Sequence, residues 1–428
     1  MNFWIVTVGE PLPLFGSRDR PWRTGLLAET LKQRGHQVLW WTSTVDHFRK
    51  ELFTAGEPTM FTDAGIEIQF LSGRLYQKNV SLARLVNHAQ IARRFSHLAA
   101  SRPPPDVILC SFPTIELCLQ AVRYGKRHGV PVALDVRDLW PDIFLDVLPG
   151  LLRPAGRMLL HPLFRDAAWS LRQCDTVFGI SEAYLHWGLQ RAQRPRRAND
   201  GVFPLGYRRS SWTAADAAAL ERRLVGCGID LRLPMATFVG TFGRTYDLAT
   251  VIDAARQLAS NSDPNVQFIL CGAGEREGDW KTRAAGLRSV AFPGWLPAAE
   301  LSCLLDRSAI GLAAYADSAP QGIPNKVIEY LSAGLPVLCS LSGESRNLLQ
   351  ETDCGLHYDA GDSSTLARQI STLMAQSAHM KAMAASARET FKSRFDAAAV
   401  YGDMADRLEG LANQPAPGRH AIDHNANG

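Results

Sequence analysis

The sequence predicts an α/β protein made of two doubly wound domains in tandem. Short apolar segments alternate with amphipathic helical segments along the chain, which is typical of parallel sheets covered by helices on both faces. The alternation begins again in the second half, after a polar stretch at residues 191–199 that holds one proline and four arginines. At 428 residues the chain is too long for one ordinary domain.

The expected elements follow one rhythm in both halves. Strands in the first half are expected at residues 3–8, 37–42, 106–111, 131–135 and 176–180, with helices at 22–34, 114–127, 153–172 and 182–190. Strands in the second half are expected at residues 235–240, 267–271, 310–313 and 336–340, with helices at 248–260, 298–306, 325–333 and 364–376.

These elements define the expected domains. We place an N-terminal domain at residues 1–205 and a C-terminal domain at 206–395. A helix at 396–413 is expected to pack back on the N-terminal domain, and 414–428 has the composition of a disordered tail. Doubly wound domains bind ligands at the carboxyl ends of their strands, so we expect the two domains to face a central cleft that holds the site.

Composition excludes several classes of protein. A net charge of +4 gives no support to a nucleic-acid partner. The eight cysteines include no C-x-x-C pair, so we expect neither a metal site nor disulfides, and a reducing compartment. No apolar run approaches the roughly 18 residues that a spanning helix needs, and the N-terminus has the pattern of a first strand, not of a signal peptide. We therefore expect a cytoplasmic protein.

The most informative segment is residues 315–340, where a loop containing Gly322 and Pro324 leads into a helix. The first N–H groups of a helix lack partners and lie at its positive end, which suits a diphosphate. Lys326, one turn into the helix, would add a full positive charge. Glu329, three residues further, would accept the hydroxyls of a ribose. The alternative is an ordinary loop-to-helix junction with a solvated lysine and glutamate.

This segment resembles the C-terminal signature of the retaining GT-B transferases of glycosyltransferase family 4, in which two glutamates are separated by seven residues. Glu329 matches the second glutamate, and Gln321 stands at the position of the first. In the family the first glutamate holds hydroxyls of the donor sugar. Glutamine keeps hydrogen-bonding capacity but has no charge, which weakens such a bond.

Other segments are similar to the same family. Residues 290–313 match the stretch that contacts the nucleobase through the backbone of Gly294, Trp295 and Leu296, and 268–274 match a strand followed by a glycine turn. Residues 342–356 resemble the subgroup that makes bacterial O-antigen, capsule and exopolysaccharide. Residues 136–142 (V-R-D-L-W-P-D) are similar to the acceptor-side motif of that subgroup. The resemblance implies a GT-B fold with two Rossmann-like domains.

The activity that the resemblance implies is retaining transfer of a sugar from a nucleotide-diphosphate donor, such as a UDP-sugar, to a glycan or polyprenyl-diphosphate-linked acceptor. Cleavage of the donor builds negative charge on the leaving phosphate. Lys326, Arg244 beside Gly243, and the loop formed by Gly322, Ile323, Pro324 and Asn325 are the candidates to stabilise that charge. Because no D-x-D triplet occurs in the sequence, we expect no metal and no other cofactor.

The acceptor side is assigned to the first domain. A long loop at residues 9–23 replaces the glycine turn after the first strand, and we select Gly16 and Arg23 within it. Asp138, in the 136–142 motif, is a candidate for the acceptor or the donor sugar. The alternatives are a surface arginine for Arg244 and a capping aspartate for Asp138.

A peripheral membrane contact is also expected. Residues 151–165 mix bulky apolar side chains with arginine and histidine, and Trp22 lies between Arg20 and Arg23. Such a basic and apolar surface would rest on anionic lipid, although the same helix would also fit with its apolar side against the first domain. Two other functions remain open, a UDP-sugar 2-epimerase-like enzyme and a non-catalytic nucleotide-sugar binding protein.

Overall fold

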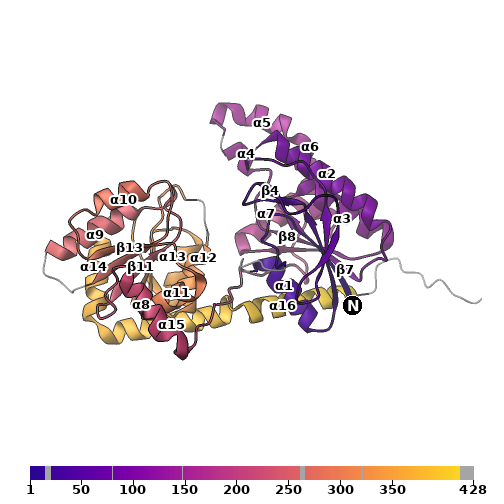
Figure 1. Ribbon diagram of the computed structural model, residues 1–428. Helices are drawn as coiled ribbons and strands as arrows, with labels where there is room; N and C mark the ends of the chain where they lie inside the picture. The colour runs from indigo at the N-terminus through magenta and orange to yellow at the C-terminus, as the bar shows by residue number, and fades with distance from the viewer. Residues whose placement is uncertain (15–20, 80, 147, 261–265, 320–321, 415–428) are drawn as a thin grey trace, which may run out of the picture. The chain divides into compact units, whose positions relative to one another are not determined.

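The computed structural model describes residues 1–14, 21–79, 81–146, 148–260, 266–319 and 322–414 (Figure 1). It divides into two compact units, which we call unit 1 and unit 2. Unit 1 comprises Met1–Gly206 and Val400–Gly428, and unit 2 comprises Tyr207–Ala399. The expected disordered tail lies, apart from Gln414, outside the described residues.

Unit 1 is built on an eight-stranded sheet in the order β10-β9-β8-β7-β1-β2-β6-β5. All its strands are parallel except β5, which pairs antiparallel with β6 at one edge. The strands are β1 Asn2–Val6, β2 Gln37–Ser43, β5 Thr59–Phe61, β6 Glu67–Leu71, β7 Val107–Phe112, β8 Val132–Val136, β9 Thr176–Gly179 and β10 Gly201–Val202, and a separate antiparallel pair is formed by β3 Val45–Asp46 and β4 Glu51–Leu52.

Helices cover this sheet on both faces, because its apolar strands would otherwise expose both sides to water. The helices are α1 Arg23–Gln33, α2 Leu82–Ala99, α3 Ile115–His128, α4 Ile143–Asp146, the short 3₁₀ helix Gly150–Leu152, α5 Arg153–Leu159, α6 His161–Gln173, α7 Glu182–Ala192 and α16 Ala397–Asn413. One core packs α2, α3, α6 and α7 against the sheet around Trp4, Trp41 and Phe95. The C-terminal helix α16 is joined to α1 through Arg34, which pairs with Asp406 and Glu409.

Unit 1 differs from the expectation in several elements, and strands β3, β4, β5, β6 and β10 and helix α4 were not predicted. The single helix expected at 153–172 is two helices, α5 and α6, with Pro162 in the first turn of α6. Proline has no N–H to donate, so it starts a helix more readily than it continues one. Helix α2 was not predicted, because its buried face includes the polar Asn87 and His88 and so interrupts the apolar pattern.

Unit 2 is built on a six-stranded, fully parallel sheet in the order β13-β12-β11-β14-β15-β16. Its strands are β11 Met235–Val239, β12 Gln267–Cys271, β13 Val290–Gly294, β14 Ile310–Ala313, β15 Val337–Cys339 and β16 Gly355–His357. Its helices are α8 Ala214–Gly226, α9 Leu248–Ser260, α10 Glu277–Arg283, α11 Ala298–Arg307, α12 Asn325–Ser332, α13 Glu344–Thr352, α14 Ser363–Ala375 and α15 Ser377–Arg394.

The core of unit 2 lies in two layers. Helices α9 and α14 pack with Phe238 and Phe268 in one cluster, and α8 and α11 pack with Met235 and Ile269 in another. Strands β13 and β16 and helices α8, α10, α13 and α15 add to the elements predicted from sequence. Among the helices of the described residues, none is both long and apolar enough to cross a membrane.

Candidate functional site

The carboxyl edge of the sheet in unit 2 is held together by its own loops. The N–H of Gly240, after β11, donates to Cys271 O at 2.9 Å, and the N–H of Gly272, after β12, donates to Gly294 O at 2.9 Å. These bonds join the ends of β11, β12 and β13 into one surface. This part of the candidate site is therefore held together by backbone hydrogen bonds and not by side chains.

Glycine is required where these loops meet. A Cβ on Gly272, whose φ is +149°, would lie 1.8 Å from Gly240 O, and one on Gly274 would lie 2.7 Å from the nitrogen of Phe242. No side chain fits at such separations, so the glycine turn at 268–274 allows two loops to approach closely.

Helix α12 begins at this edge without a side-chain cap. Pro324 stands at the N-cap position, and no side chain of the described residues bonds the first turn there. The preceding loop is fixed by the S-G-E-S segment, because the Ser345 hydroxyl donates to Gly322 O and a Cβ on Gly322 would meet Glu344 at 2.2 Å. Gln321, expected to contact the donor sugar, lies outside the described residues.

Lys326 is held in an aromatic cage. Its side chain runs from the first turn of α12 to the end of β11, where Nζ donates to Val239 O. Nζ lies 4.1 Å from the ring centres of both Phe238 and Tyr246 and 5.6 Å from that of Tyr315. The residue as a whole is only 7% exposed. Contrary to the expectation of an ammonium reaching toward phosphate, Lys326 is mostly enclosed by rings and backbone.

The charge of Lys326 is weakly compensated. Burial lowers its pKa to about 7, against the opposing effects of Glu329 and the Cys271 thiol. Among the described residues, no carboxylate forms an ion pair with it. Cation–π contacts and one carbonyl replace only part of the lost hydration. An anion arriving at this edge would therefore stabilise the protonated form.

Glu329 lies one turn further along α12. Its Oε1 accepts a hydrogen bond of 2.7 Å from the hydroxyl of Tyr207, the first residue of unit 2. Glu329 is half-buried, whereas Tyr207 is buried. The carboxylate proposed to bind ribose is thus already held by one hydroxyl.

The other donor-side candidates lie on the loops of the same sheet. Arg244, next to Gly243 after β11, is 87% exposed and pairs with Glu275 after β12 at 3.3 Å. Gly294 ends β13 with a φ of +76°, Trp295 is 70% exposed, and Leu296 is buried. The indole of Trp295 and the guanidinium of Arg244 are thus the solvent-facing members of this group.

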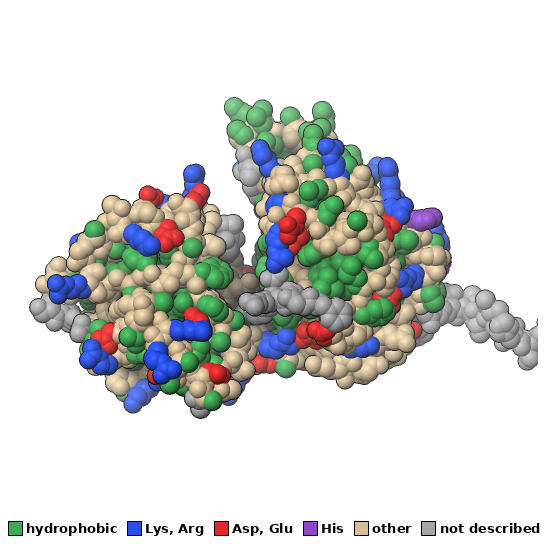
Figure 2. Space-filling model, viewed as in Figure 1, with side chains coloured by type: hydrophobic (Ala, Val, Ile, Leu, Met, Phe, Trp, Pro, Cys, Tyr) green, Lys and Arg blue, Asp and Glu red, His purple; other side chains and the backbone are tan. Residues whose placement is uncertain are grey.

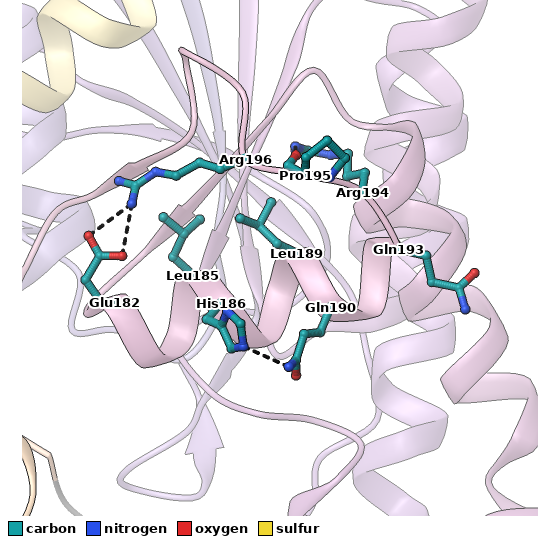
Figure 3. Close-up of a pocket in the computed structure, with 9 residues that line it drawn as sticks. All are labelled: Glu182, Leu185, His186, Leu189, Gln190, Gln193, Arg194, Pro195 and Arg196. Carbon is teal, nitrogen blue, oxygen red and sulfur yellow. Dashed lines mark hydrogen bonds and ion pairs between the residues drawn. The ribbon is translucent and has the colours of Figure 1, made fainter.

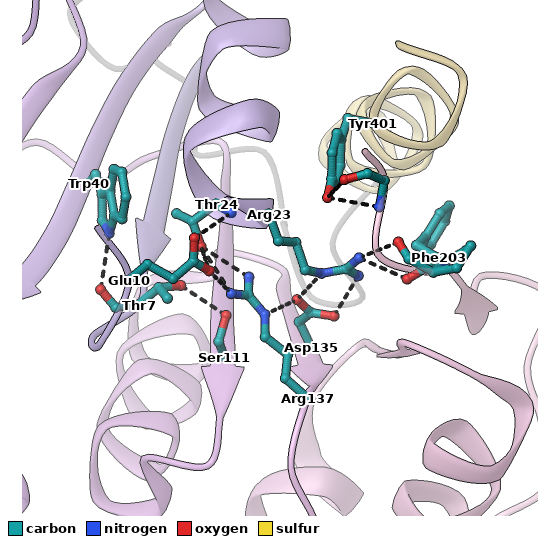
Figure 4. Close-up of polar contacts among 12 residues, drawn as sticks. Thr7, Glu10, Arg23, Thr24, Trp40, Ser111, Asp135, Arg137, Phe203 and Tyr401 are labelled. Atoms are coloured by element: carbon teal, nitrogen blue, oxygen red, sulfur yellow. Dashed lines mark hydrogen bonds and ion pairs between the residues drawn. The ribbon is translucent and has the colours of Figure 1, made fainter. Parts of the chain in front are cut away.

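In unit 1 the structure corrects the assignment of Arg23. This residue is buried, and its guanidinium forms two bonds of 2.8 Å with Asp135 and further bonds to the carbonyls of Phe203 and Pro204 (Figure 4). Each of its three side-chain nitrogens donates a hydrogen bond inside unit 1, so the structure does not place it to bind an acceptor. Gly16, its predicted companion, lies outside the described residues.

Arg23 belongs to a buried network at the carboxyl ends of β1 and β8. Arg137 bonds Asp135 at 2.6 Å and also binds Glu10, which accepts from the hydroxyl and N–H of Thr24 at the start of α1 (Figure 4). Burial would raise the pKa of Asp135, but the two arginines bring it to about 2. Two cations face two carboxylates, so the network is electrically balanced.

Asp138 follows this network in the 136–142 loop. Its Oδ1 accepts the N–H of Leu139 at 2.8 Å. Burial raises its pKa, with backbone hydrogen bonding and the charge of Arg84 acting in the opposite direction. This bond lies within the loop, and the half-buried carboxylate remains the candidate on this side.

A cavity of about 390 Å³ in unit 1 contains none of the predicted site residues (Figure 3). It lies beside α7, where Arg196 pairs with Glu182 and His186 bonds Gln190. Arg194, which also lines it, is paired with Asp200. Because these charges satisfy one another, the cavity offers no obvious ligand site. Across the described residues, no group of three or more His, Cys, Asp or Glu is placed to hold a metal ion.

Comparison with known proteins identifies the segment that contains this site. A family model described as Glycosyl transferases group 1 matches residues 234–376. The match covers 143 of the 428 residues, about a third of the chain. The amylovoran biosynthesis glycosyltransferase AmsK of Erwinia amylovora is 28% identical over 171 residues, which are 39% of this chain and 42% of AmsK. Alpha-maltose-1-phosphate synthase of Mycolicibacterium smegmatis is 25% identical over 271 residues, 58% of this chain and 65% of that protein. The chain thus matches less than two thirds of the length of these relatives.

The fold is shared more widely than the sequence. The crystal structure of Anabaena Alr3699/HepE in complex with UDP superposes with a TM-score of 0.65 at 18% identity, covering 96% of this chain and 99% of that one. The predicted α/β class and GT-B fold are therefore confirmed, and so is the resemblance at the level of the family.

Several residues of the site were missed by sequence reasoning. Tyr315 begins the most informative segment, and Tyr246 lies in the loop after β11, yet neither was expected to surround Lys326. Tyr207 and Ser345 were not selected either. The only available signal was position, since Tyr246 and Tyr315 follow the strands β11 and β14 whose ends meet α12.

Proposed function

We propose that the protein is a glycosyltransferase that moves a sugar from a nucleotide-diphosphate donor, a UDP-sugar, to a glycan or lipid-linked glycan acceptor. The observation that carries this proposal is the meeting of an uncapped helix start, the lysine Lys326 and the carboxylate Glu329 at one sheet edge. The family match spans this edge, and the similar HepE structure holds UDP. AmsK, by its name, acts in amylovoran biosynthesis, which supports a role in surface polysaccharide synthesis.

In the proposed reaction, the role of each candidate residue follows from the part of the donor or acceptor that it would contact. As the bond between sugar and phosphate breaks, negative charge grows on the leaving diphosphate. The first amides of α12, Arg244 and Lys326 would stabilise that charge. Glu329 would bind the ribose, and the segment from Gly294 to Leu296 would contact the base. Gln321 would hold donor-sugar hydroxyls, and Asp138 would face the acceptor or the sugar.

Product analysis with and without an acceptor tests this function. The purified chain is incubated with UDP-sugars and a polyprenyl-diphosphate-linked glycan, and both substrates are followed. Transfer consumes donor and acceptor together, and NMR of the new linkage is expected to show retention at the anomeric carbon. Conversion of the donor alone would support the 2-epimerase alternative, and unchanged substrates with bound donor would support a non-catalytic binding protein.

Metal independence is a separate part of the proposal. It is supported by the absence of a D-x-D triplet and by the basic groups near the expected diphosphate. Transfer is expected to continue at an unchanged rate in excess EDTA. Loss of activity in EDTA that Mg²⁺ or Mn²⁺ restores would contradict it.

A peripheral contact with the cytoplasmic face of a membrane is supported by the tip of unit 1. Figure 2 shows apolar side chains gathered over α5. Leu159 and Met158 of α5 are 81% and 80% exposed, and Leu151, in the 3₁₀ helix before it, is 95% exposed. Residues 148–165 contain three arginines and no acidic residue. Apolar side chains beside arginines are complementary to anionic lipid. Trp22 instead packs on Phe48 and Arg23 is buried, so the contact that we propose is confined to this tip.

Sedimentation with vesicles tests the contact. The chain is expected to sediment with phosphatidylglycerol-containing vesicles and to be released by salt, which screens exposed charges. Changing both Leu151 and Leu159 to serine should abolish sedimentation. The matched control changes Val225, an exposed apolar residue of unit 2, to serine. Equal recovery in the supernatant with neutral and anionic vesicles at low salt would contradict the proposal.

A further inference from the structure

Tyr207 is the residue at which the chain enters unit 2. Its side chain is buried, and its hydroxyl lies 2.7 Å from Oε1 of Glu329. The carboxylate assigned to the ribose is therefore in contact with the first residue of its own unit. The two residues are 122 positions apart in sequence, so only the fold brings them together.

The backbone of Tyr207 is fixed by the segment that joins α15 to α16. Its N–H donates to Phe395 O at 2.8 Å, and its carbonyl accepts from the N–H of Ala397 at 3.2 Å. Its ring meets that of Phe391 edge-on at 6.4 Å. With both backbone groups and the ring held, the hydroxyl has a defined position.

The residues before Tyr207 are held equally firmly. Both backbone groups of Gly206 lie within hydrogen-bonding distance of the Tyr401 hydroxyl, at 3.1 and 3.3 Å. Arg23 binds the carbonyls of Phe203 and Pro204 at 2.7 and 2.9 Å (Figure 4). The connecting segment at residues 203–207, through which the chain passes from unit 1 to unit 2, is thus fixed by hydrogen bonds to its backbone, and Tyr207 is its last residue.

We propose that Tyr207 is a positioning residue of the donor site, which fixes the Glu329 carboxylate to accept the ribose hydroxyls of a nucleoside diphosphate. The inference rests on the proposed function for the nucleotide donor. A carboxylate offers about four acceptor sites on its two oxygens, and Tyr207 uses one of them. This bond sets the orientation of the carboxylate, so less side-chain freedom is lost when the nucleotide binds.

Calorimetric titration with two nucleotides tests the inference. UDP carries both ribose hydroxyls, and 2′,3′-dideoxy-UDP carries neither. The wild type is expected to bind UDP more tightly, and Tyr207→Phe should weaken UDP binding by roughly five- to tenfold while leaving the dideoxy compound nearly unchanged. In transfer assays the same variant should raise the donor KM with kcat close to wild type.

Tyr401→Phe is the matched control. It removes the same atom from a buried tyrosine that also bonds the connecting segment, but its partner is the backbone of Gly206 and not Glu329. Its affinity for UDP should stay within about twofold of wild type. Thermal unfolding of both variants checks that each is folded. Glu329→Gln provides a second variant, and it should also reduce the preference for UDP over the dideoxy compound.

The outcomes separate this inference from the function on which it rests. A wild type that binds no UDP would contradict the proposed donor and the inference together. A wild type that prefers UDP, with the preference unchanged in Tyr207→Phe, would overturn the inference alone. Equal losses for both nucleotides would also overturn it, since they would indicate a general structural role.

Discussion

Both units bury charged side chains near the carboxyl ends of their parallel strands, but they compensate those charges differently. In unit 1, Arg23 and Arg137 face Asp135 and Glu10 in a balanced network. In unit 2, Lys326 is surrounded by rings and one carbonyl, and no carboxylate of the described residues pairs with it. The charges of the first arrangement balance one another, whereas the positive charge of the second is only partly compensated.

This difference in charge compensation distinguishes residues that stabilise the fold from candidates for ligand binding. Removing one partner of a buried ion pair destabilises the fold, because the other charge is left buried without a partner. We therefore interpret the balanced network of unit 1 as a structural element of the fold. An under-compensated cation carries a desolvation cost that an arriving anion relieves. Strongly shifted groups of this second kind are often found at functional sites. The comparison therefore directs the search for donor binding to Lys326 and away from Arg23.

The largest expected effect is on the stability of unit 1. Arg23→Met would leave Asp135 buried with one cation instead of two, and we expect the free energy of unfolding to fall by about 3–5 kcal/mol. Denaturant titration measures this. Arg244→Met is the matched control, because Arg244 is 87% exposed, and its effect should stay within about 0.5 kcal/mol. If the two substitutions lowered the free energy of unfolding equally, the proposed difference between the buried Arg23 and the exposed Arg244 would be contradicted.

The acid side of the same network gives a signed pH dependence. The pKa of Asp135 is about 2 in the folded protein, below its ordinary value of 3.8, so the unfolded chain binds more protons between these values. Its contribution is complete above about pH 4 and is lost as the pH falls toward 2. In Arg23→Met the loss should begin at a higher pH. An acid-unfolding midpoint identical to that of the wild type would contradict the role of the pair.

The next effect is on catalysis in unit 2. Lys326→Met keeps much of the side-chain volume but removes the charge, and kcat should fall about 100-fold, which is about 2.7 kcal/mol. Because a poorly compensated ammonium is removed, thermal unfolding should occur no lower than in wild type. Lys326→Arg should recover only part of the rate. A folded Lys326→Met enzyme with normal kcat would show that this lysine does not meet the leaving phosphate.

The smallest effect is a proton taken up with the ligand. Since the pKa of Lys326 is about 7, the group is mostly neutral at pH 8, and a bound diphosphate should raise that pKa. UDP binding at pH 8 should therefore take up a fraction of one proton. Titrations in two buffers of different ionisation enthalpy measure that number. The uptake should be absent in Lys326→Met, and equal uptake by both proteins would assign it to another group.

The sequence by itself determined the class of fold and indicated where the candidate site lies along the chain. Alternating strands and helices, the glycine turn at 268–274 and the loop before α12 are local patterns, and local patterns follow from neighbouring residues. The glycine turn around Gly272 can be recognised from the local sequence alone. The need for glycine at this position is tertiary, because a Cβ there would collide with Gly240 O. These patterns were sufficient to locate Lys326 and Glu329.

Only the tertiary structure decided what surrounds these residues. Arg23 and Asp135 are 112 residues apart, and Lys326 and Val239 are 87 apart, so no spacing in the sequence announces either contact. An arginine in a long loop has the same sequence signature whether it binds a ligand or a buried carboxylate. The charge state of Lys326 likewise depends on burial among Phe238, Tyr246 and Tyr315, which come from two distant stretches of the chain. Burial and pairing are properties of packing, and packing is set by residues that are distant along the chain.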